Sequence, residues 1–587
     1  MLSNTVAALL GCALMSLPAM AQLTPYVFSA ENSASYNANI AQGSLFVVYG
    51  ANFGPAQLVQ ASSYPLTTQL AGTAISVTSG STSIPCPMVY SIAGAAAAVM
   101  PSSVPPGRAM LSLTYNGQSS PFPVTVNVVP SAVGIYTLDS SGLGAGVFTG
   151  TDGSVKTFAA SSKNGDIITA WATGLGAVSG PDDVVPSSFP NFPGVEVFVG
   201  TQAANVIYAG RSGCCVALDQ IAFEVPAGVT GCYVPVAVRS GGTISNFASM
   251  AVSSGGGPCS DTAPTVPISI MNRASAGQPV KAAALAAGPV SVLRGLGFDV
   301  KLYLSQSLSK LLRVKVSQDD VAKLLLAGQT RNQRELARAM IKYAAAWKAL
   351  SPAAKLAVRA VLNSNQEGAV ADFGQFNTPG ALAAGLGGLF PSQGTCSALP
   401  SVYRSNSANG LDAGSSLALS GPAGSWTLTP TRAGQYQVLF GTTPIGPNLP
   451  TGTYTITGTG GHDVNAFSAT LNVGGSVLWT NKAAISSVDR SQPLTVTWSG
   501  GPIPGSVVLG GYVNSNTLGL VGFVCTEDTS VGSFTIPSFI LATLPAAASG
   551  AGMFISPHPL SRQVTIPGMD LAYFMDGSSD AKSLVYQ

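Results

Sequence analysis

The chain has 587 residues, which is too many for one hydrophobic core and indicates about three or four domains. Only 9% of the residues are charged, against roughly 25% in ordinary globular domains, and small and hydroxyl-bearing residues take their place. The formal net charge of +2 excludes strong electrostatic steering of a charged partner by the whole chain, and no nucleic-acid partner is expected.

The first 21 residues have the pattern of a secretory signal peptide. An apolar stretch over 6–17 precedes the small-x-small sequence AMA at 19–21, so cleavage is expected before Gln22. The alternative is a lipid anchor at Cys12, because the sequence LLGC that ends there resembles a bacterial lipoprotein box. No later segment reaches the ~20 consecutive apolar residues of a membrane span. The mature protein is therefore expected to be secreted or held at the cell surface.

The stretch GSLFVVYGANFGP at 43–55 returns 122 residues later as GDIITAWATGLGAVSGP. In both copies an apolar strand-forming run ends at glycines, which tolerate positive φ angles. Tyr49 and Trp171 occupy matching places and are expected in the core. Short alternating strands separated by Gly, Pro and Ser turns continue through both copies. This pattern predicts two tandem immunoglobulin-like β-sandwiches, over 30–128 and 129–254.

The two copies resemble a known family. The strand that leads into YGANFG resembles the IPT/TIG immunoglobulin-like domains. The motifs YTLDSSGLGAGVFTGTDGSV, ATGLGAV, VEVFVG, VIYAG and DQIAFEVPAGVTGCYVPVAV resemble the Solibacter-type uncharacterised domain of acidobacterial secreted proteins. The likeness covers about residues 30–254. It implies an immunoglobulin-like fold and export, and it brings no catalytic residue to this chain.

The rest of the chain changes character twice. A Gly-, Ser- and Pro-rich stretch predicts a linker over 255–275, and helix-forming residues then predict a small, basic helical region over 276–392. Strands that alternate apolar and hydroxyl residues return afterwards and predict a C-terminal β-sandwich over 393–560. Residues 561–587 are expected to be a tail. The predicted fold class is therefore mainly β.

Three tryptophans lie in the predicted C-terminal sandwich. Trp426 and Trp479 are candidates for stacking on sugar rings, provided that they are exposed. The alternative is that they lie in the core, where large rings contribute much of the stability of a sandwich. Trp498 alternates with apolar residues and is expected in the core.

Seven cysteines remain after the predicted cleavage, and an exported compartment permits disulfides. Cys396 and Cys525 bracket the predicted C-terminal sandwich and are expected to bond to each other. Cys86 is expected to be a buried, unreactive thiol. No CxxC pair occurs, which argues against a structural zinc site.

The other four cysteines fall in or next to the second sandwich. Cys214 and Cys215 are adjacent, so in a strand their side chains would face opposite ways. They are therefore expected to bond with Cys232 and Cys259, in an order that the sequence leaves open.

No arrangement of residues typical of catalysis is found. The chain has two histidines, His462 and His558, and no G-x-S-x-G elbow precedes either. Acidic residues occur near the second sandwich without the spacing of a known calcium loop, and no rule unites them into an acid–base pair. They are Asp182, Asp183, Glu196, Asp219 and Glu224.

These features favour a secreted or cell-surface binding or adhesion protein without catalytic activity and without a cofactor. Its expected ligand is a polysaccharide or a cell-wall polymer. Two alternatives remain, an exported hydrolase that acts on polysaccharide and a purely structural envelope spacer.

A prediction concerns the basic region. Between residues 273 and 359 the sequence holds 15 basic and four acidic residues, a local excess of +11. If this charge has an anionic partner, reversing Arg331, Arg334 and Arg338 to Glu should weaken binding to anionic polymers, and salt should weaken binding by the unchanged protein. Retention on a heparin column over a salt gradient measures both effects. No retention of the unchanged protein at low salt would mean that the helices are simply solvated.

Overall fold

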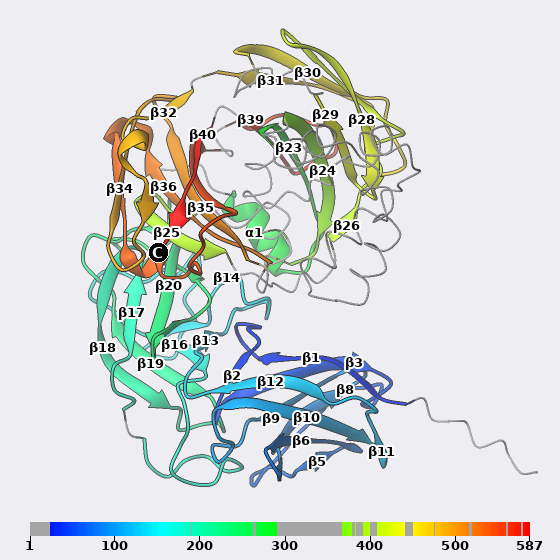
Figure 1. The fold of residues 1–587 in the computed structure, drawn as a ribbon, viewed down its shortest axis with the longest axis vertical. Helices are drawn as coiled ribbons and strands as arrows, with labels where there is room; N and C mark the ends of the chain where they lie inside the picture. Colours follow the sequence, from blue (N-terminus) through cyan, green and yellow to red (C-terminus); the bar gives the residue numbers. More distant parts are fainter. Residues whose placement is uncertain are drawn as a thin grey trace, which may run out of the picture.

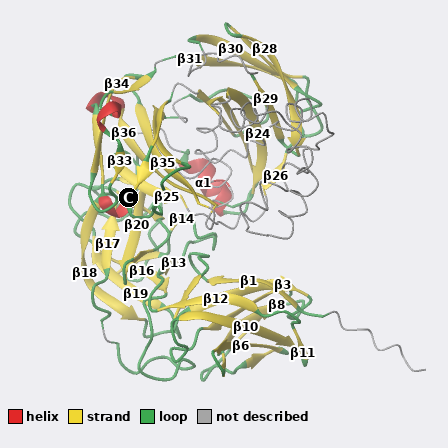
Figure 2. Cartoon of the chain, in the orientation of Figure 1, coloured by secondary structure: helices red, strands yellow, loops and turns green. Residues whose placement is uncertain are grey.

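The structure is a computed structural model. It describes residues 24–189, 191–261, 266–289, 367–378, 382, 391–399, 408–440, 450–474, 476–515, 519–558, 562–576 and 579–587. Strands dominate (Figures 1 and 2), which confirms the predicted mainly-β fold class. No helix within these residues is long and apolar enough to cross a membrane. The predicted signal peptide and Arg331, Arg334 and Arg338 lie outside the described residues.

The first sandwich, drawn in blue in Figure 1, packs two sheets around one core. Their strands pair antiparallel except for β2 and β12, which pair in parallel. The first sheet has the order β1-β3-β9-β8-β4, with bounds Tyr26–Asn32, Leu45–Ala51, Ala95–Val99, Met88–Ile92 and Val59–Gln60. The second has the order β2-β12-β10-β6-β5, with bounds Asn39–Ala41, Val124–Val129, Gly107–Tyr115, Thr73–Ser79 and Gln69–Leu70. Two short strands pair beside longer ones, β11 (Gln118–Ser119) with β10 and β7 (Thr82–Pro85) with β6. Alternate residues of these strands point inward, as in β6, where every second side chain is buried.

The second sandwich has its strands connected in one series. Their order is β13-β16-β19-β18-β17-β20-β22-β14, with bounds Gly134–Ile135, Ile167–Thr173, Asp219–Glu224, Gln202–Arg211, Glu196–Val199, Gly231–Ser240, Ala248–Val252 and Gly144–Ala145. β15 (Phe148–Gly150) and β21 (Thr243–Ile244) pair at the sides. The start of β18 pairs with β17 and the remainder pairs with β19, so this long strand links the two layers.

The internal repeat is visible in the strands. β3 begins at Leu45 and β16 begins at Ile167, and both strands are seven residues long, so the 122-residue offset holds at both ends. Each copy packs around its own buried cluster.

The prediction of a helical region over 276–392 is wrong at both of its ends. β23 (Val280–Pro289) and β24 (Glu367–Phe376) are antiparallel partners over ten residue pairs. The alanines of β23 are at most 3% exposed, because neighbouring strands and packed layers cover both faces. A strand that is buried on both faces lacks the alternation of apolar and polar residues that identifies other strands. A run of small apolar residues such as this one can therefore be mistaken for a helical segment in the sequence. The part between these strands lies outside the described residues.

The predicted linker over 255–275 contains a helix, α1 (Ile268–Ser275). Ile270, Met271 and Ala274 form its buried face and join a core cluster that also contains Val280. Spacings of one, three and four residues place these side chains on one side of a helix.

The predicted C-terminal sandwich is instead two β-structures, and both include strands from outside 393–560. The first is a nine-stranded sheet of order β31-β30-β27-β28-β29-β24-β23-β39, with β26 (Ala408–Gly410) paired to β24. Its other new bounds are Phe467–Val473 for β31, Gly452–Gly458 for β30, Leu417–Gly421 for β27, Gly424–Arg432 for β28, Gln435–Leu439 for β29 and Leu571–Asp576 for β39.

The second C-terminal β-structure combines smaller sheets around another core. A five-stranded sheet has the order β25-β36-β35-β38-β40, with bounds Thr395–Leu399, Gly519–Asp528, Ser506–Ser515, Ala551–Pro557 and Asp580–Ser583. A three-stranded sheet follows, with β32 (Val477–Trp479), β34 (Leu494–Gly500) and β37 (Ser533–Ile536). β33 (Ser487–Val488) pairs with β41 (Val585–Tyr586), and the short helices are η1 (Lys482–Ala484), η2 (Thr529–Val531) and α8 (Ser538–Leu541).

Residues 561–587 are therefore not a tail. β39, β40 and β41 all lie within them, and Tyr573 and Tyr586 are at most 1% exposed. Ring stacking also attaches the second sandwich to the C-terminal part, since Phe198 and Phe539 have ring centroids 4.0 Å apart at an interplanar angle of 11°.

A buried arginine joins the two sandwiches. The Arg211 guanidinium forms an ion pair with Asp219 and also donates to the carbonyl oxygens of Gly43 and Gly176, the former at 2.8 Å. Gly43 belongs to the first sandwich, and the other three residues belong to the second. Gly43 has φ +67°, and a Cβ there would lie 2.7 Å from the arginine, so glycine is required at this close approach. Burial raises the pKa of the Asp219 carboxyl, and Arg211 offsets part of that increase.

Further hydrogen bonds cross the same joint. The backbone N–H of Leu45 donates to the Thr173 hydroxyl at 2.9 Å, and the Asn32 side-chain amide donates to the Ala132 carbonyl at 2.9 Å. The Ser102 hydroxyl donates to a carboxylate oxygen of Asp182 at 2.7 Å. Asp182 therefore helps to hold the two sandwiches together.

One prediction tests the revised domain boundaries. A fragment over 393–560 should aggregate or remain unfolded, because it lacks β23, β24 and β39 from the nine-stranded sheet. A matched fragment over 24–261 should unfold cooperatively, because it keeps both sandwiches and both Cys232 and Cys259. Circular dichroism during thermal unfolding of each fragment measures this. Cooperative unfolding of 393–560 would contradict the shared-sheet boundary.

A second prediction tests the joint. Arg211→Met should lower the free energy of unfolding by about 3–5 kcal/mol, because it leaves the Asp219 carboxylate buried without its cation. The double variant Arg211→Met/Asp219→Leu should be more stable than the single variant, since no buried charge remains. Urea unfolding of both variants measures the difference. Equal stability of the two variants would mean that Asp219 does not depend on Arg211.

Candidate functional site

The two sandwiches enclose an open cleft of about 900 Å³ beside their joint. The first sandwich contributes the segment after β4, together with single residues of β3 and β8, and the second contributes residues around β13, β16 and the turn between β18 and β19. The lining residues are Leu45, Ala61, Ser62, Ser63, Tyr64, Leu66, Val89, Tyr136, Thr137, Leu138, Ser140, Val147, Trp171, Cys214, Cys215, Val216 and Leu218.

The lining is apolar and aromatic. The Trp171 ring is half-buried, and its Nε1–H donates to the Thr149 hydroxyl at 3.0 Å, which fixes the ring and satisfies its polar atom. Tyr64 is 46% exposed and accepts a hydrogen bond from the backbone N–H of Val216 at 3.4 Å. The expectation that Trp171 lies in the core is therefore wrong in part, because the joint leaves this side chain at the edge of the cleft.

Hydroxyl groups supply the polar atoms of the cleft. Ser62, Ser63 and Ser140 line it together with the ring of Tyr136. The Tyr136 hydroxyl is hydrogen-bonded to the Ser33 hydroxyl at 2.8 Å, and burial raises the pKa of Tyr136 above its usual range, so the phenol stays neutral. Within the part of the chain that the structure describes, the residues that line the cleft include no Asp, Glu, His, Lys or Arg. The cleft therefore offers apolar surface and neutral hydroxyls.

Cys214 and Cys215 bond to each other, with Cα atoms 3.8 Å apart, so the predicted bonds from them to Cys232 and Cys259 are wrong. The prediction assumed a strand, in which neighbouring side chains face opposite ways. Both cysteines instead lie in the turn that follows β18 and precedes β19, where this alternation does not apply. Cys232 bonds to Cys259.

The predictions for the remaining cysteines are confirmed. Cys396 in β25 bonds to Cys525 in β36, which is its antiparallel partner in the five-stranded sheet. Cys86 is a free, fully buried thiol, and burial raises its pKa above the usual range, which makes it unreactive.

The tryptophans proposed for sugar stacking are not exposed platforms. Trp479 is 2% exposed and lies in the core of the second C-terminal β-structure, together with Trp498. Trp426 is half-buried and packs against Phe440, with ring centroids 4.5 Å apart. Alternating residues of a strand face the core, which places Trp479 inside and turns Trp426 partly inward.

The candidate catalytic residues are not brought together. Asp219 is bonded to Arg211, Glu196 pairs with Arg239, and Glu224 lies at the far end of β19 from Asp219. His462 is exposed in a turn, and its Nδ1 lies 2.7 Å from a carboxylate oxygen of the neighbouring Asp463. His558 is buried, which lowers its pKa to about 3. Among the described residues, no three His, Cys, Asp or Glu side chains are placed to hold a metal ion.

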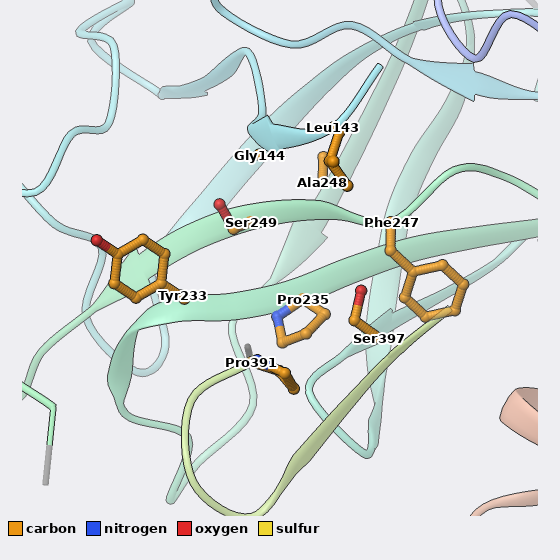
Figure 3. A pocket seen from close by; sticks show the side chains of 9 residues that line it. All are labelled: Leu143, Gly144, Tyr233, Pro235, Phe247, Ala248, Ser249, Pro391 and Ser397. Carbon is orange, nitrogen blue, oxygen red and sulfur yellow. The ribbon is translucent and has the colours of Figure 1, made fainter. Parts of the chain in front are cut away.

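Two other cavities border the second sandwich. The smaller one has a volume of about 20 Å³, which is room for about one water molecule. Figure 3 shows the side chains around it, among them Tyr233, Phe247 and Pro391. A cavity of about 490 Å³ lies where both sandwiches meet the C-terminal part, lined by residues such as Asn37, Asn246 and Val521. Asn246 is already bonded to backbone atoms of Ile135 and Gly142.

No family model matches the sequence, and no curated protein matches it. Solved structures with some likeness include γ-CGTase from alkalophilic Bacillus clarkii, at 12% identity over 42% of this chain and 25% of that one, with a TM-score of 0.16. The chain spans only 16% of the plexin A4 extracellular region, at a TM-score of 0.15 and 11% identity over 40% of this chain.

A third similar structure is SGBP-B from the mixed-linkage glucan utilization locus of Bacteroides ovatus, which was solved in complex with a mixed-linkage heptasaccharide. The identity is 12%, over 92% of this chain and 95% of that one, and the TM-score is 0.12. TM-scores this low carry no argument about function.

Proposed function

We propose that this chain is an exported, non-catalytic binding protein whose ligand is a neutral polysaccharide, bound in the cleft between the two sandwiches. One observation carries the proposal. The cleft combines the rings of Tyr64 and Trp171 with serine and threonine hydroxyls, and none of the described residues that line it is Asp, Glu, His, Lys or Arg.

The chemistry of a neutral sugar matches this lining. A pyranose ring presents C–H groups on its faces, which pack against aromatic rings, and hydroxyls around its rim, which exchange hydrogen bonds with neutral hydroxyls. The cleft is open to solvent, so a sugar can enter it from outside. Its volume of about 900 Å³ is of the size that binds several sugar rings or a drug-sized molecule.

Export is supported by two independent features. The predicted signal peptide ends at a small-x-small site, and three disulfides require an oxidising compartment to persist. Adhesion to a cell wall or to an extracellular glycan suits a protein of this kind.

A polysaccharide hydrolase is the alternative of a different class. Glycoside hydrolysis ordinarily needs two carboxylic acids on either side of the bond that breaks. The described residues that line the cleft provide neither, so we favour binding over hydrolysis. A structural spacer would bind no glycan at all.

A prediction tests the cleft. Tyr64→Ala should weaken binding to the preferred neutral polysaccharide roughly tenfold, or about 1.4 kcal/mol, because a sugar ring loses its aromatic contact. Trp171→Phe should weaken binding less, because a smaller ring remains. Phe122→Ala is the matched control, because Phe122 is a 70% exposed aromatic outside the cleft lining.

Affinity electrophoresis against a panel of glucans, xylans and cell-wall polysaccharides identifies the ligand, and titration calorimetry then measures the variants. An equal loss of affinity in Phe122→Ala and Tyr64→Ala would contradict the assignment of the cleft. Release of reducing sugar ends from the bound polymer would favour the hydrolase.

A further inference from the structure

The three disulfides differ in their exposure to solvent. Cys214 is exposed and Cys215 is half-buried, whereas the two cysteines of each other disulfide are at most 6% exposed. A thiol reductant must reach a sulfur atom to attack it, so exposure decides which bond is reduced first. A mild dithiol therefore has one accessible target among these three disulfides.

This exposed disulfide lies in a turn that forms part of the cleft wall. Cys214 and Cys215 both line the cleft, and so does Val216, which follows them. The turn is held at its ends by Arg211 and Asp219, the ion pair of the joint between the sandwiches.

The middle of the turn is also packed against the first sandwich. Val216 and Ala217 are 6% and 4% exposed and share a small apolar cluster with Leu66 and Val99. Val216 also donates its N–H to the Tyr64 hydroxyl. The shape of the turn therefore sets the position of one wall of the cleft.

We infer that the Cys214–Cys215 disulfide is a ligand-contacting, redox-sensitive wall of this cleft, and that its reduction weakens binding of the neutral polysaccharide. The inference rests on the proposed function. The carbon and sulfur atoms of the disulfide form a compact apolar surface. The Ser212 hydroxyl donates a hydrogen bond to Cys214 Sγ at 3.1 Å. Such a surface packs against the C–H face of a sugar ring.

The chemical step needs a thiol reductant. A dithiol supplies two electrons and two protons; the S–S bond breaks, two cysteine thiols form, and the dithiol becomes a disulfide. Opening the eight-membered ring of adjacent cysteines frees both side chains to change rotamer. The apolar surface is then divided into two mobile thiols, and ordering them around a ligand costs conformational entropy.

The experiment uses the full chain and the polysaccharide that binds most tightly in the panel. The protein is treated with a low concentration of dithiothreitol, alkylated without denaturant and mapped by mass spectrometry. We expect alkylation at Cys214 and Cys215 and none at Cys86, Cys232, Cys259, Cys396 or Cys525. We also expect affinity to fall roughly tenfold, or about 1.4 kcal/mol, and to return after reoxidation.

The matched control is the double variant Cys214→Ser/Cys215→Ser. It should bind as weakly as the reduced protein, respond to dithiothreitol with no further change, and retain its thermal unfolding temperature to within a few degrees.

The outcomes separate the two proposals. An oxidised protein that binds no member of the panel would overturn the proposed function. An oxidised protein that binds, together with a reduced protein that binds equally well, would leave the proposed function standing and overturn the inference about the disulfide. Alkylation of Cys232 or Cys396 at the same reductant concentration would overturn the selectivity on which the inference depends.

Discussion

The arrangement of the two sandwiches depends on one buried cation. Arg211 is almost fully inaccessible to solvent, and its charge is balanced by Asp219 and by carbonyl oxygens from both sandwiches. Its guanidinium also lies 5.6 Å from the ring centroid of Phe192. A buried charge without these partners would cost several kcal/mol, so the sandwiches are held in the one arrangement that supplies them all. The walls of the cleft take their positions from this joint, since Arg211 and Asp219 also flank the turn that carries Cys214 and Cys215.

Local sequence patterns were sufficient for the sandwich repeat. β3 and β16 could be placed because strand alternation and turn glycines act over a few neighbouring residues and recur at a fixed spacing. β23 could not be placed in the same way. Its alanine-rich sequence is compatible with a helix, and only its pairing with β24 and β39, far away in the chain, makes it a strand. Tertiary pairing of this kind leaves little trace in the local sequence.

The candidate site was less predictable than the fold, for a related reason. The place of Trp171 in the repeat predicts a core residue, but the joint between the two sandwiches leaves its side chain half-buried at the cleft. Strand geometry predicts that Cys214 and Cys215 bond to other cysteines, but the residues around them form a turn, in which they bond to each other. Trp479 was a plausible sugar platform by composition, and its strand turns it inward. Each error concerns the surroundings of a side chain rather than its chemistry.

The parallel pairing of β23 with β39 also constrains the order in which the chain can fold. Ala282 lies opposite Leu571, and Val488 lies opposite Tyr586, the penultimate residue. During synthesis or export, the two sandwiches have all their strands long before the C-terminal part does. The C-terminal sheets must wait for residues 571–586 to emerge, and contacts of such sequence separation form slowly. A chain that is cut short before residue 571 would therefore present open sheet edges, which can pair with strands of other chains and cause aggregation.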